Sequence, residues 1–430
     1  MDMGRCSDKF RDPVHGFIEV SALERELIDS EPFQRLRNIK QLAMTCLVFH
    51  GAEHTRFGHS IGVMHMVTRA FESAVKNGKP GWEEAKIAFY RQVLRLIALT
   101  HDLGHAPFSH AAESVFPAGM EHEDFTRKIV LETEIRNIID KIGAEFKQKY
   151  GRGYEITPEL ICTIYQGLDP GPDMEYVFLK SFMDSEMDCD KMDYLLRDAL
   201  YCGVNYGKYD VERLISCLTI YQSDGFPRLA IRSGGVQAFE EFMLARYFMF
   251  VQVYFHRTRR FFDKMYFSAL KEILPGGTFP VDTKEYLLWD DYQVWNLLKA
   301  HANSSYACDN IVHRKVYPRV FETKTHPAEA DFRNFKLMRK IIYDKFGEDR
   351  FIEDCSADKM PHKIPIRTTP EDERAIIIID ETEGKISTIS EESIIIKSLT
   401  EKINIQRIYL CDRSIFDEVA RCVQEYVHIV

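Results

Sequence analysis

The sequence predicts a mainly α-helical protein that carries a small β-hairpin and ends in a smaller α+β lobe. From about residue 30 to residue 275, apolar residues recur at helical spacing, which indicates a helical domain. The runs Leu218–Tyr221 and Arg228–Arg232 favour strands and flank Ser223-Asp-Gly225, a sequence typical of a hairpin turn. After residue 280, β-branched runs bounded by polar turns indicate the mixed lobe.

The segment Leu274–Pro280 is typical of a hinge, because it contains two prolines and a pair of glycines. We therefore expect two domains, one over residues 1–275 and one over residues 281–430. The second should contain a helix near 332–346 and strands at 374–379, 393–397 and 405–410.

Composition excludes several classes of protein. With 430 residues, 45% of them hydrophobic and 28% charged, the chain is too large for a peptide hormone and too apolar for a disordered protein. Its net charge of −10 repels polyanions, so nucleic acid is expected as a partner only through a local basic patch. His256–Arg260 is such a patch, and the alternatives are a solvated face or a contact for an acidic partner.

Several features favour a cytoplasmic protein without a membrane segment. The first nine residues lack the apolar core of a secretory signal, and the ten cysteines show no Cys-x-x-Cys spacing, which indicates buried free thiols in a reducing compartment. The longest apolar stretch, Phe242–Phe255, is too short to span a bilayer and contains Arg246.

The segment Gln92–Gly104 predicts a helix that ends at its glycine and places polar residues toward the core. Its apolar stripe runs through Leu94 and Ile97, and the next members of that stripe are His101 and Asp102. Burying a carboxylate without a counter-charge costs several kcal/mol, so a cationic group is expected beside Asp102.

Two other predicted helices add polar groups on structured faces. His59 begins the apolar stripe of a helix that starts near Gly58, and Asp190, Tyr194 and Asp198 follow one another at i, i+4 and i+8. Two imidazoles and two carboxylates converging on a core suit a divalent Fe, Mn, Zn, Ni or Co ion with positions left for water and substrate. The alternative is that His59 and His101 are ordinary hydrogen-bonded core histidines.

Three more histidines follow closely, namely His105, His110 and His122. They are too many for one ion, and imidazoles that titrate near neutrality suit proton transfer and contact with phosphate oxygens beside a metal. The alternative is a set of solvent-facing loop histidines.

The ordered set His59, His101-Asp102 and Asp190 resembles the H…HD…D signature of the HD-domain metal-dependent phosphohydrolases. The flanking residues resemble the deoxynucleoside triphosphate triphosphohydrolase branch of that family, over about residues 9 to 265. The matching segments are Asp12–Gly16, Phe33–Arg37, Ile39–Leu42, His54–Ser60, His101–His110 and Asp188–Tyr194.

This resemblance implies an HD-domain helical core and an enzyme that cleaves the bond between the 5′ oxygen and the α-phosphorus. The products are a deoxynucleoside and inorganic triphosphate. Matched by position, the metal ligands would be His59, His101, Asp102 and Asp190, and the catalytic residues His105, His110 and His122 with Asp190. Contacts to the phosphates or to water beside the metal would come from Arg56, Lys191, Tyr194, Arg246 and His256.

The same resemblance implies how the sugar is recognised. Gln41 and Asp198 would hydrogen-bond the 3′-hydroxyl, and Leu42 and Tyr254 would crowd the 2′ position. Magnesium would accompany the substrate triphosphate. The cationic patch at residues 256–260 would attract a substrate with about four negative charges.

Relatives in this branch assemble as tetramers through nucleotides bound between subunits, so the resemblance implies a homo-oligomer, a dimer or tetramer, and an activating nucleotide. The residues near the corresponding positions are Asp29, Gln34, Arg35, Arg37 and Arg213. Ordinary surface or helix-pairing salt bridges are the alternative for these five.

Two other functions fit the sequence. One is an HD-domain phosphohydrolase that acts on another nucleotide phosphoester and releases orthophosphate. The other is a catalytically decayed protein that binds nucleotides or single-stranded nucleic acid, for which Arg257, Arg259 and Arg260 would be needed.

Overall fold

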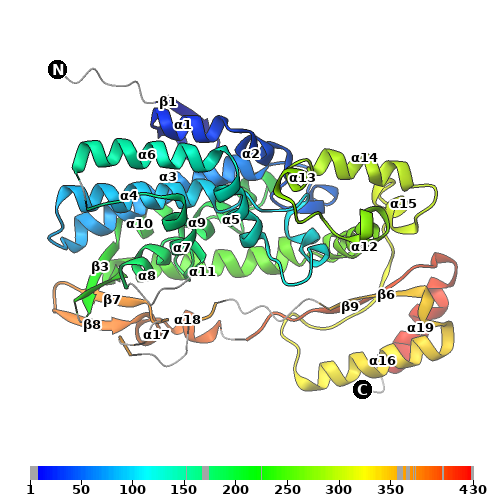
Figure 1. The fold of residues 1–430 in the computed structure, drawn as a ribbon. Coiled ribbons are helices and arrows are strands. Elements are labelled where there is room, and N and C mark those ends of the chain that lie inside the picture. Colours follow the sequence, from blue (N-terminus) through cyan, green and yellow to red (C-terminus); the bar gives the residue numbers. More distant parts are fainter. Residues whose placement is uncertain are drawn as a thin grey trace.

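The computed structural model describes residues 8–151, 153–166, 174–223, 225–355, 362–364, 369–370, 372, 374–399 and 401–427. Most of these residues are helical, and three small sheets accompany the helices (Figure 1). The predicted fold class, a helical core with a small hairpin and a C-terminal α+β part, is confirmed.

Among the described residues up to 273, twelve α-helices form the body of the molecule. They are α1 (Ala22–Asp29), α2 (Glu31–Gln34), α3 (Arg56–Gly78), α4 (Glu84–Thr100), α5 (His122–Glu132), α6 (Glu134–Tyr150), α7 (Pro158–Gln166), α8 (Met174–Ser181), α9 (Cys189–Cys202), α10 (Val211–Ser216), α11 (Val236–Met249) and α12 (Arg257–Ile273). Helix α3 is buried along most of its length between α4 and α9. This position places its polar residues inside the core.

Short helical turns connect these helices. The 3₁₀ turns are η1 (Arg35–Asn38), η2 (Ala43–Leu47), η3 (Ser109–Val115), η4 (Ser233–Gly235), η6 (Pro275–Gly277), η7 (Glu348–Arg350) and η8 (Arg413–Ile415). The turn η5 (Phe250–Tyr254), which continues α11, is a π-helix. Such turns occur often at functional sites.

Strands from distant parts of the chain form the three sheets. β1 (Asp8–Asp12) pairs with β2 (Gly16–Val20), and the predicted hairpin is present as β3 (Leu218–Ser223) and β4 (Phe226–Arg232). The hairpin is extended by a parallel pairing of β4 with β7 (Ile377–Asp380), which pairs in turn with β8 (Lys385–Thr388). The third sheet has the order β5 (Arg319–Glu322), β9 (Gln406–Leu410), β6 (Phe351–Cys355). Asp224, in the predicted turn, lies outside the described residues.

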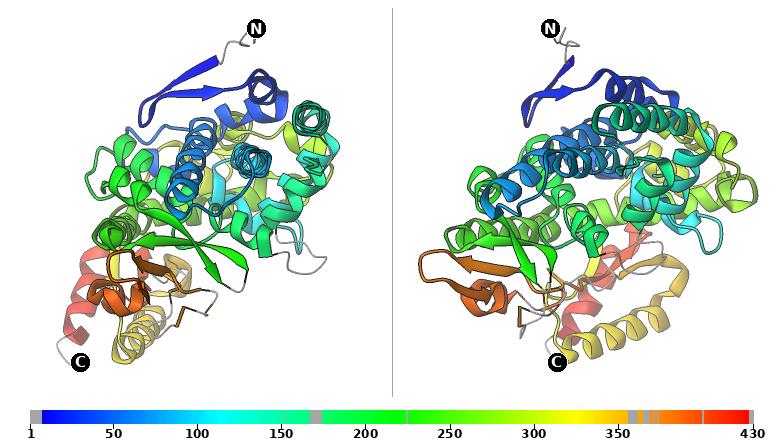
Figure 2. Two further views of the ribbon diagram at one scale, coloured as in Figure 1. Left: turned by 90° about the vertical axis from the view of Figure 1, so that its left-hand side faces the viewer. Right: turned by 60° about the vertical axis from the view of Figure 1, so that its left-hand side comes forward.

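The remaining α-helices follow the segment predicted as a hinge. They are α13 (Thr283–Leu287), α14 (Asp291–His301), α15 (Tyr306–Val312), α16 (Glu329–Phe346), α17 (Ile389–Glu392), α18 (Ile394–Ser398) and α19 (Phe416–Val427). Helices α14 and α15 pack against α12, whereas the elements from α16 onward gather on one side of the helical body (Figures 1 and 2). The division into domains at residues 275 and 281 stays a prediction.

Two sequence-based expectations about elements are wrong. Residues 393–397 form the start of α18 and not a strand, because Ser393 caps the helix by accepting a hydrogen bond from Ile396 N at 3.0 Å. Only Ile396 of the three isoleucines is buried, and Ile394 is 80% exposed. Helix α4 ends at Thr100 and not at Gly104, although His101 still has helical backbone angles as its C-cap.

No helix in the described part of the chain is both long enough and apolar enough to cross a bilayer. The described cysteines are free, but they are not all buried as expected: Cys355 is exposed, and Cys46 and Cys411 are half-buried. Cys6 lies outside the described residues.

Candidate metal centre

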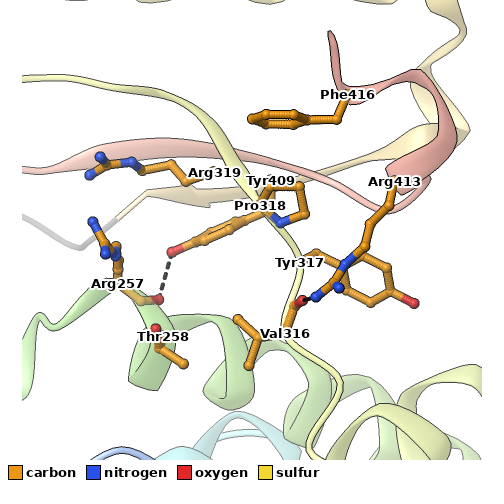
Figure 3. Close-up of a pocket in the computed structure, with 9 residues that line it drawn as sticks. All are labelled: Arg257, Thr258, Val316, Tyr317, Pro318, Arg319, Tyr409, Arg413 and Phe416. Carbon is orange, nitrogen blue, oxygen red and sulfur yellow. Dashed lines mark hydrogen bonds between the residues drawn. The ribbon is translucent and has the colours of Figure 1, made fainter. Parts of the chain in front are cut away.

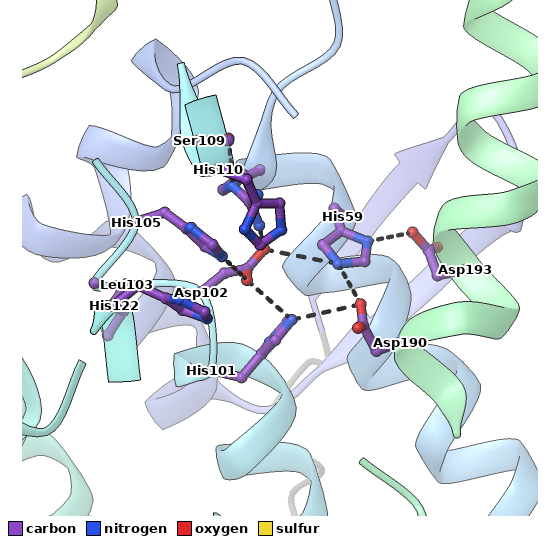
Figure 4. A network of polar contacts seen from close by, with 12 residues as sticks. His59, His101, Asp102, Leu103, His105, Ser109, His110, His122, Asp190 and Asp193 are labelled. Carbon is purple, nitrogen blue, oxygen red and sulfur yellow. Dashed lines mark hydrogen bonds and ion pairs between the residues drawn. The ribbon is translucent and has the colours of Figure 1, made fainter. Parts of the chain in front are cut away.

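Helices α3, α4 and α9 bring the four predicted ligands together (Figure 4). One donor atom from each of His59, His101 and Asp102 lies within 4.8 Å of the others. From α9, Asp190 Oδ1 lies 2.9 Å from His59 Nε2 and 3.9 Å from His101 Nε2. The structure therefore joins two imidazoles and two carboxylates that are up to 131 positions apart in the sequence.

Hydrogen bonds fix the outer nitrogen of each imidazole and leave the inner one facing the centre. His59 Nδ1 donates to Asp193 Oδ2 at 2.8 Å, and His101 Nδ1 donates to the backbone oxygen of Ala98 at 2.7 Å. His101 Nε2 is buried and has no hydrogen-bond partner. Metal-bound histidines are held in this way, by a carboxylate or a carbonyl behind the ring.

A buried arginine supplies the counter-charge that the sequence predicts for Asp102. Arg56 Nη1 donates to Asp102 Oδ2 at 2.6 Å, and Arg56 Nε donates to Ser109 Oγ at 2.7 Å. Burial opposes ionisation of Asp102, but Arg56 and the neighbouring histidines hold the pKa of this carboxyl well below its ordinary value. The guanidinium predicted to contact phosphate thus compensates the charge of a carboxylate that is predicted to bind the metal.

Carboxylates surround His59 and stabilise a positive charge on its imidazole. Burial disfavours the imidazolium, but hydrogen bonds to Asp190 and Asp193 outweigh burial and raise the pKa of His59 to about 10. The anionic surroundings that favour a proton here equally favour a divalent cation, which would displace that proton.

These residues fit a divalent transition metal ion. The centre offers imidazole nitrogens and carboxylate oxygens, one buried nitrogen has no partner, and a second layer of hydrogen bonds orients the rings. The donor types suit Fe, Mn, Zn, Ni or Co equally, so they do not select one of these ions.

The predicted catalytic histidines lie beside the centre, on the far side of Asp102 from His59 (Figure 4). His105 Nε2 lies 3.1 Å from Asp102 Oδ1, and the rings of His105 and His122 stack with centroids 4.0 Å apart. His110 and His122 contact Glu113, a residue without a predicted role. Burial opposes ionisation of Glu113, yet these two histidines bring the pKa of its carboxyl below the ordinary range.

Two of the four predicted sugar contacts, Asp198 and Tyr254, touch each other. Asp198 Oδ2 accepts a hydrogen bond from the Tyr254 hydroxyl at 2.7 Å, and Asp198 Oδ1 accepts one from His54 Nε2 at 2.8 Å. The rings of Tyr194 and Tyr254 lie 6.2 Å apart. Gln41 is buried with an unpartnered Oε1, and Leu42 is buried next to it in sequence.

Two predicted phosphate contacts are held by acids from one short segment. Lys191 Nζ donates to Asp188 Oδ2 and to the backbone oxygen of Ser185, and Arg246 Nη1 donates to Glu186 Oε2 at 2.7 Å. Arg246 Nε is buried without a partner. These cations therefore sit next to one another in the fold with their positions fixed by residues 185–188.

The cationic patch at residues 256–260 is largely occupied by ion pairs. Arg260 binds Asp354 at 2.6 Å, and Arg259 lies 3.4 Å from Asp263. His256 is the N-cap of α12 and accepts a hydrogen bond from Thr258 N at 3.3 Å. The expectation of a free basic surface therefore holds only for Arg257.

Comparison with known proteins identifies the fold. The HD domain model matches residues 56–185, and the HD associated region model matches residues 209–429. An uncharacterized Bacillus subtilis protein, YwfO, is 32% identical over 93% of this chain and 91% of its own length. The chain belongs to the HD-domain superfamily of phosphohydrolases.

Two further proteins are similar to this chain. A crystal structure of a hypothetical Aquifex aeolicus protein superposes with a TM-score of 0.78 at 32% identity and covers 97% of this chain and 99% of that one. The Danio rerio deoxynucleoside triphosphate triphosphohydrolase SAMHD1 is 28% identical to this chain. The matched region covers 76% of this chain and 58% of that relative's length.

The five residues predicted to bind an activating nucleotide already have partners within this chain. Arg35 is buried and donates to the backbone oxygens of Trp289, Leu103 and His105. Arg37 donates to Gln34 at 2.7 Å, Asp29 pairs with Arg25, and Arg213 donates to the backbone of Gly234. Within this chain, the five residues therefore form structural hydrogen bonds and helix-pairing salt bridges.

A separate cavity lies elsewhere in the HD-domain chain, between α12 and the β5–β9 sheet (Figure 3). It has a volume of about 610 Å³ and contains none of the predicted metal ligands or catalytic histidines, although Arg257 and Thr258 belong to the cationic patch at residues 256–260. Its lining residues are Arg257, Thr258, Val316, Tyr317, Pro318, Arg319, Tyr409, Arg413 and Phe416.

Sequence reasoning missed several residues that support the centre. Asp193 is buried and accepts hydrogen bonds from His15, His59 and Arg197. Asp291, on α14, accepts hydrogen bonds from the backbone nitrogens of Phe108 and Lys40, at 2.7 and 2.9 Å. The spacing of Asp190 and Asp193 on one helical face was the available signal for Asp193; Asp291 had none.

Proposed function

We propose that this protein hydrolyses deoxynucleoside triphosphates to a deoxynucleoside and inorganic triphosphate with a divalent metal ion. The observation that carries the proposal is the joint placement of the His59, His101, Asp102 and Asp190 centre beside three histidines and two half-buried cations, Lys191 and Arg246. The SAMHD1 relatives, named as deoxynucleoside triphosphate triphosphohydrolases, support the choice of substrate.

A metal ion bound at this centre would act as a Lewis acid toward a phosphoryl oxygen. Lys191 and Arg246 would bind the phosphate oxygens of the substrate, and Arg56 would keep Asp102 ionised. In the reaction, the oxygen of water bonds to the α-phosphorus, the bond to the 5′ oxygen breaks, and that oxygen receives a proton. A histidine of the 105, 110 and 122 group would supply this proton.

Recognition of the sugar would depend on Asp198 and Tyr254. A carboxylate that already accepts two hydrogen bonds is held rigidly and can accept a third from a 3′-hydroxyl. The Tyr254 ring, fixed by its bond to Asp198, would leave no room for a 2′-hydroxyl. Gln41 and Leu42 would complete this part of the site.

We also propose a cytoplasmic homo-oligomer, a dimer or a tetramer. Magnesium would enter with the substrate triphosphate. An activating nucleotide would use the exposed residues Asp29, Arg37 and Arg213 and the half-buried Gln34, contributed by more than one subunit.

The decisive experiment incubates metal-reconstituted protein with each of the four deoxynucleoside triphosphates and the matched ribonucleotides, and identifies products by chromatography. Deoxynucleoside and inorganic triphosphate are expected, and His101→Ala and Asp102→Ala should abolish turnover. Release of orthophosphate would instead indicate another HD-domain phosphohydrolase. Absence of hydrolysis with every metal, together with nucleic acid binding that depends on Arg257, would indicate a binding protein.

A further inference from the structure

A second group of metal-binding side chains lies next to the first centre. His105 is in the turn after α4, His110 and Glu113 are on η3, and His122 is the first residue of α5. Donor atoms of all four lie within 4.8 Å of one another. Each of the three imidazoles directs Nδ1 at the same oxygen, Glu113 Oε1, at 3.8 Å from His105, 2.7 Å from His110 and 3.0 Å from His122.

Nδ1 of His105 is buried and has no hydrogen-bond partner for its lone pair. Its Nε2 lies 3.1 Å from the ionised Asp102, so Nε2 carries the proton and Nδ1 does not. Nδ1 is buried, has no hydrogen-bond partner, and faces a carboxylate oxygen 3.8 Å away. An unprotonated nitrogen and a carboxylate oxygen that face each other inside a protein repel one another. A cation bound between them would remove this repulsion.

The spacing of the four donors suits a tetrahedral ion. Bonds of about 2.0–2.1 Å to nitrogen and oxygen place neighbouring ligands of a tetrahedral zinc ion about 3.3 Å apart. The three separations from Glu113 Oε1, between 2.7 and 3.8 Å, lie on both sides of this value. Small side-chain rotations would therefore bring the donors to bonding distance.

We propose that Nδ1 of His105, His110 and His122 and Oε1 of Glu113 bind a second transition metal ion of the zinc type. This site is separate from the first centre. Nδ1 of His105 faces Glu113 and the second site, whereas Nε2 of the same ring faces Asp102 and the first centre. Its existence does not depend on the proposed function. Its effect on activity does depend on the proposed function. An ion bound by these histidines would prevent them from contacting the substrate, so excess zinc should inhibit turnover.

The test counts metal ions on the full chain. Metal-depleted wild-type protein is saturated with Zn²⁺, passed through a desalting column and measured by elemental analysis, and the same proteins are titrated with Co²⁺ and followed by visible absorption. Two zinc ions per chain are expected for wild type. His110→Ala and Glu113→Gln should hold one ion, and the double variant His101→Ala, Asp102→Ala should also hold one.

The control is His313→Ala, because His313 forms a similar but exposed pair with Asp309 at 2.8 Å. This variant should retain both ions. Since the His110 side chain is 62% exposed, its removal should leave the fold intact, which circular dichroism checks. The proposal is overturned if wild type holds one ion that His110→Ala and Glu113→Gln also hold. Loss of the predicted phosphohydrolysis would leave the metal count unchanged, so the two proposals fail separately.

Discussion

Asp193 Oδ2 accepts a hydrogen bond from His59 Nδ1 at 2.8 Å, and the same carboxylate is held by Arg197 through bonds of 2.8 and 2.9 Å. This arrangement sets the tautomer of His59 and directs its Nε2 toward Asp102 and Asp190. Arg197 is fixed in turn by Asp12 at 2.9 Å. The orientation of one predicted metal ligand thus depends on β1, which contains Asp12, and on α9, which contains Asp193 and Arg197.

Asp193→Asn should lower the metal affinity of the first centre about 10–100-fold, the usual effect of losing a carboxylate behind a metal-bound imidazole. Competition with a chromogenic chelator measures this affinity. Asp12→Asn is the matched control, because Asp12 also binds Arg197 but does not contact His59. Equal losses in both variants would show that general destabilisation, and not the orientation of His59, is responsible.

Gly62→Ala should destabilise the fold and weaken metal binding together. A Cβ at Gly62 would lie 2.0 Å from Asp193 Oδ1 and 2.3 Å from Arg197 Nη2, so the pair would have to separate inside the core. Breaking a buried ion pair costs about 3–5 kcal/mol, which urea unfolding measures. Gly58→Ala, one turn earlier, meets only Arg197 Nη1 at 3.3 Å and should change the free energy of unfolding far less.

Asp291→Asn should flatten the pH dependence of stability between about pH 4 and pH 7. Burial raises the pKa of Asp291 to about 7, although two backbone hydrogen bonds oppose this rise. In this range the folded protein keeps a proton on Asp291 that the unfolded chain releases, so the contribution of Asp291 to wild-type stability should be fully present below pH 3.8 and should fall as the pH rises toward 7. Thermal unfolding of both proteins across this range tests the difference; parallel curves would refute it.

Glu186→Gln should lower KM for the proposed substrate about three- to tenfold. Glu186 neutralises Arg246, and its other oxygen accepts a hydrogen bond from Lys363 N at 3.0 Å. Without the negative charge, Arg246 attracts a phosphate more strongly, while the amide retains a hydrogen bond to Lys363. Glu381→Gln, which removes an exposed partner of Arg232, serves as the control. An increase in KM would show that Glu186 is needed to position Arg246.

Tyr254→Ala should weaken the rejection of ribonucleotides about tenfold, because the ring would no longer occupy the space beside the sugar. The ratio of kcat/KM for matched deoxy- and ribonucleotides measures this selectivity. Tyr254→Phe keeps the ring but loses the bond to Asp198, and it should retain most of the selectivity. If both variants discriminate like wild type, Tyr254 does not contact the sugar.

The metal centre could be predicted from sequence because its residues interrupt strong helical patterns. His101 and Asp102 continue the apolar stripe of α4, and His59 begins that of α3, so periodicity alone directs them into the core. The cation beside Asp102 was predicted from the cost of a buried charge, and Arg56 meets that expectation. The residue pattern within each helix was therefore sufficient to predict that these side chains face the core.

Other features depend on contacts that no local pattern carries. Asp291 binds Phe108 across 183 positions, and it helps to hold the backbone at Phe108 and Ser109, which both have a φ of 56°. At residues 394–396, the β-branched side chains favour a strand, but capping by Ser393 and the burial of one face favour a helix. In each case, tertiary structure outweighs the local preference.

The parallel pairing of β4 with β7 has a consequence for any attempt to shorten the protein. A fragment that stops near residue 275 would lose β7 and uncover a row of amide and carbonyl groups along Ala230–Arg232. Unprotected edges of this kind recruit strands from neighbouring molecules. Such a fragment should therefore self-associate and precipitate, and it would be a poor starting point for crystallisation or binding studies.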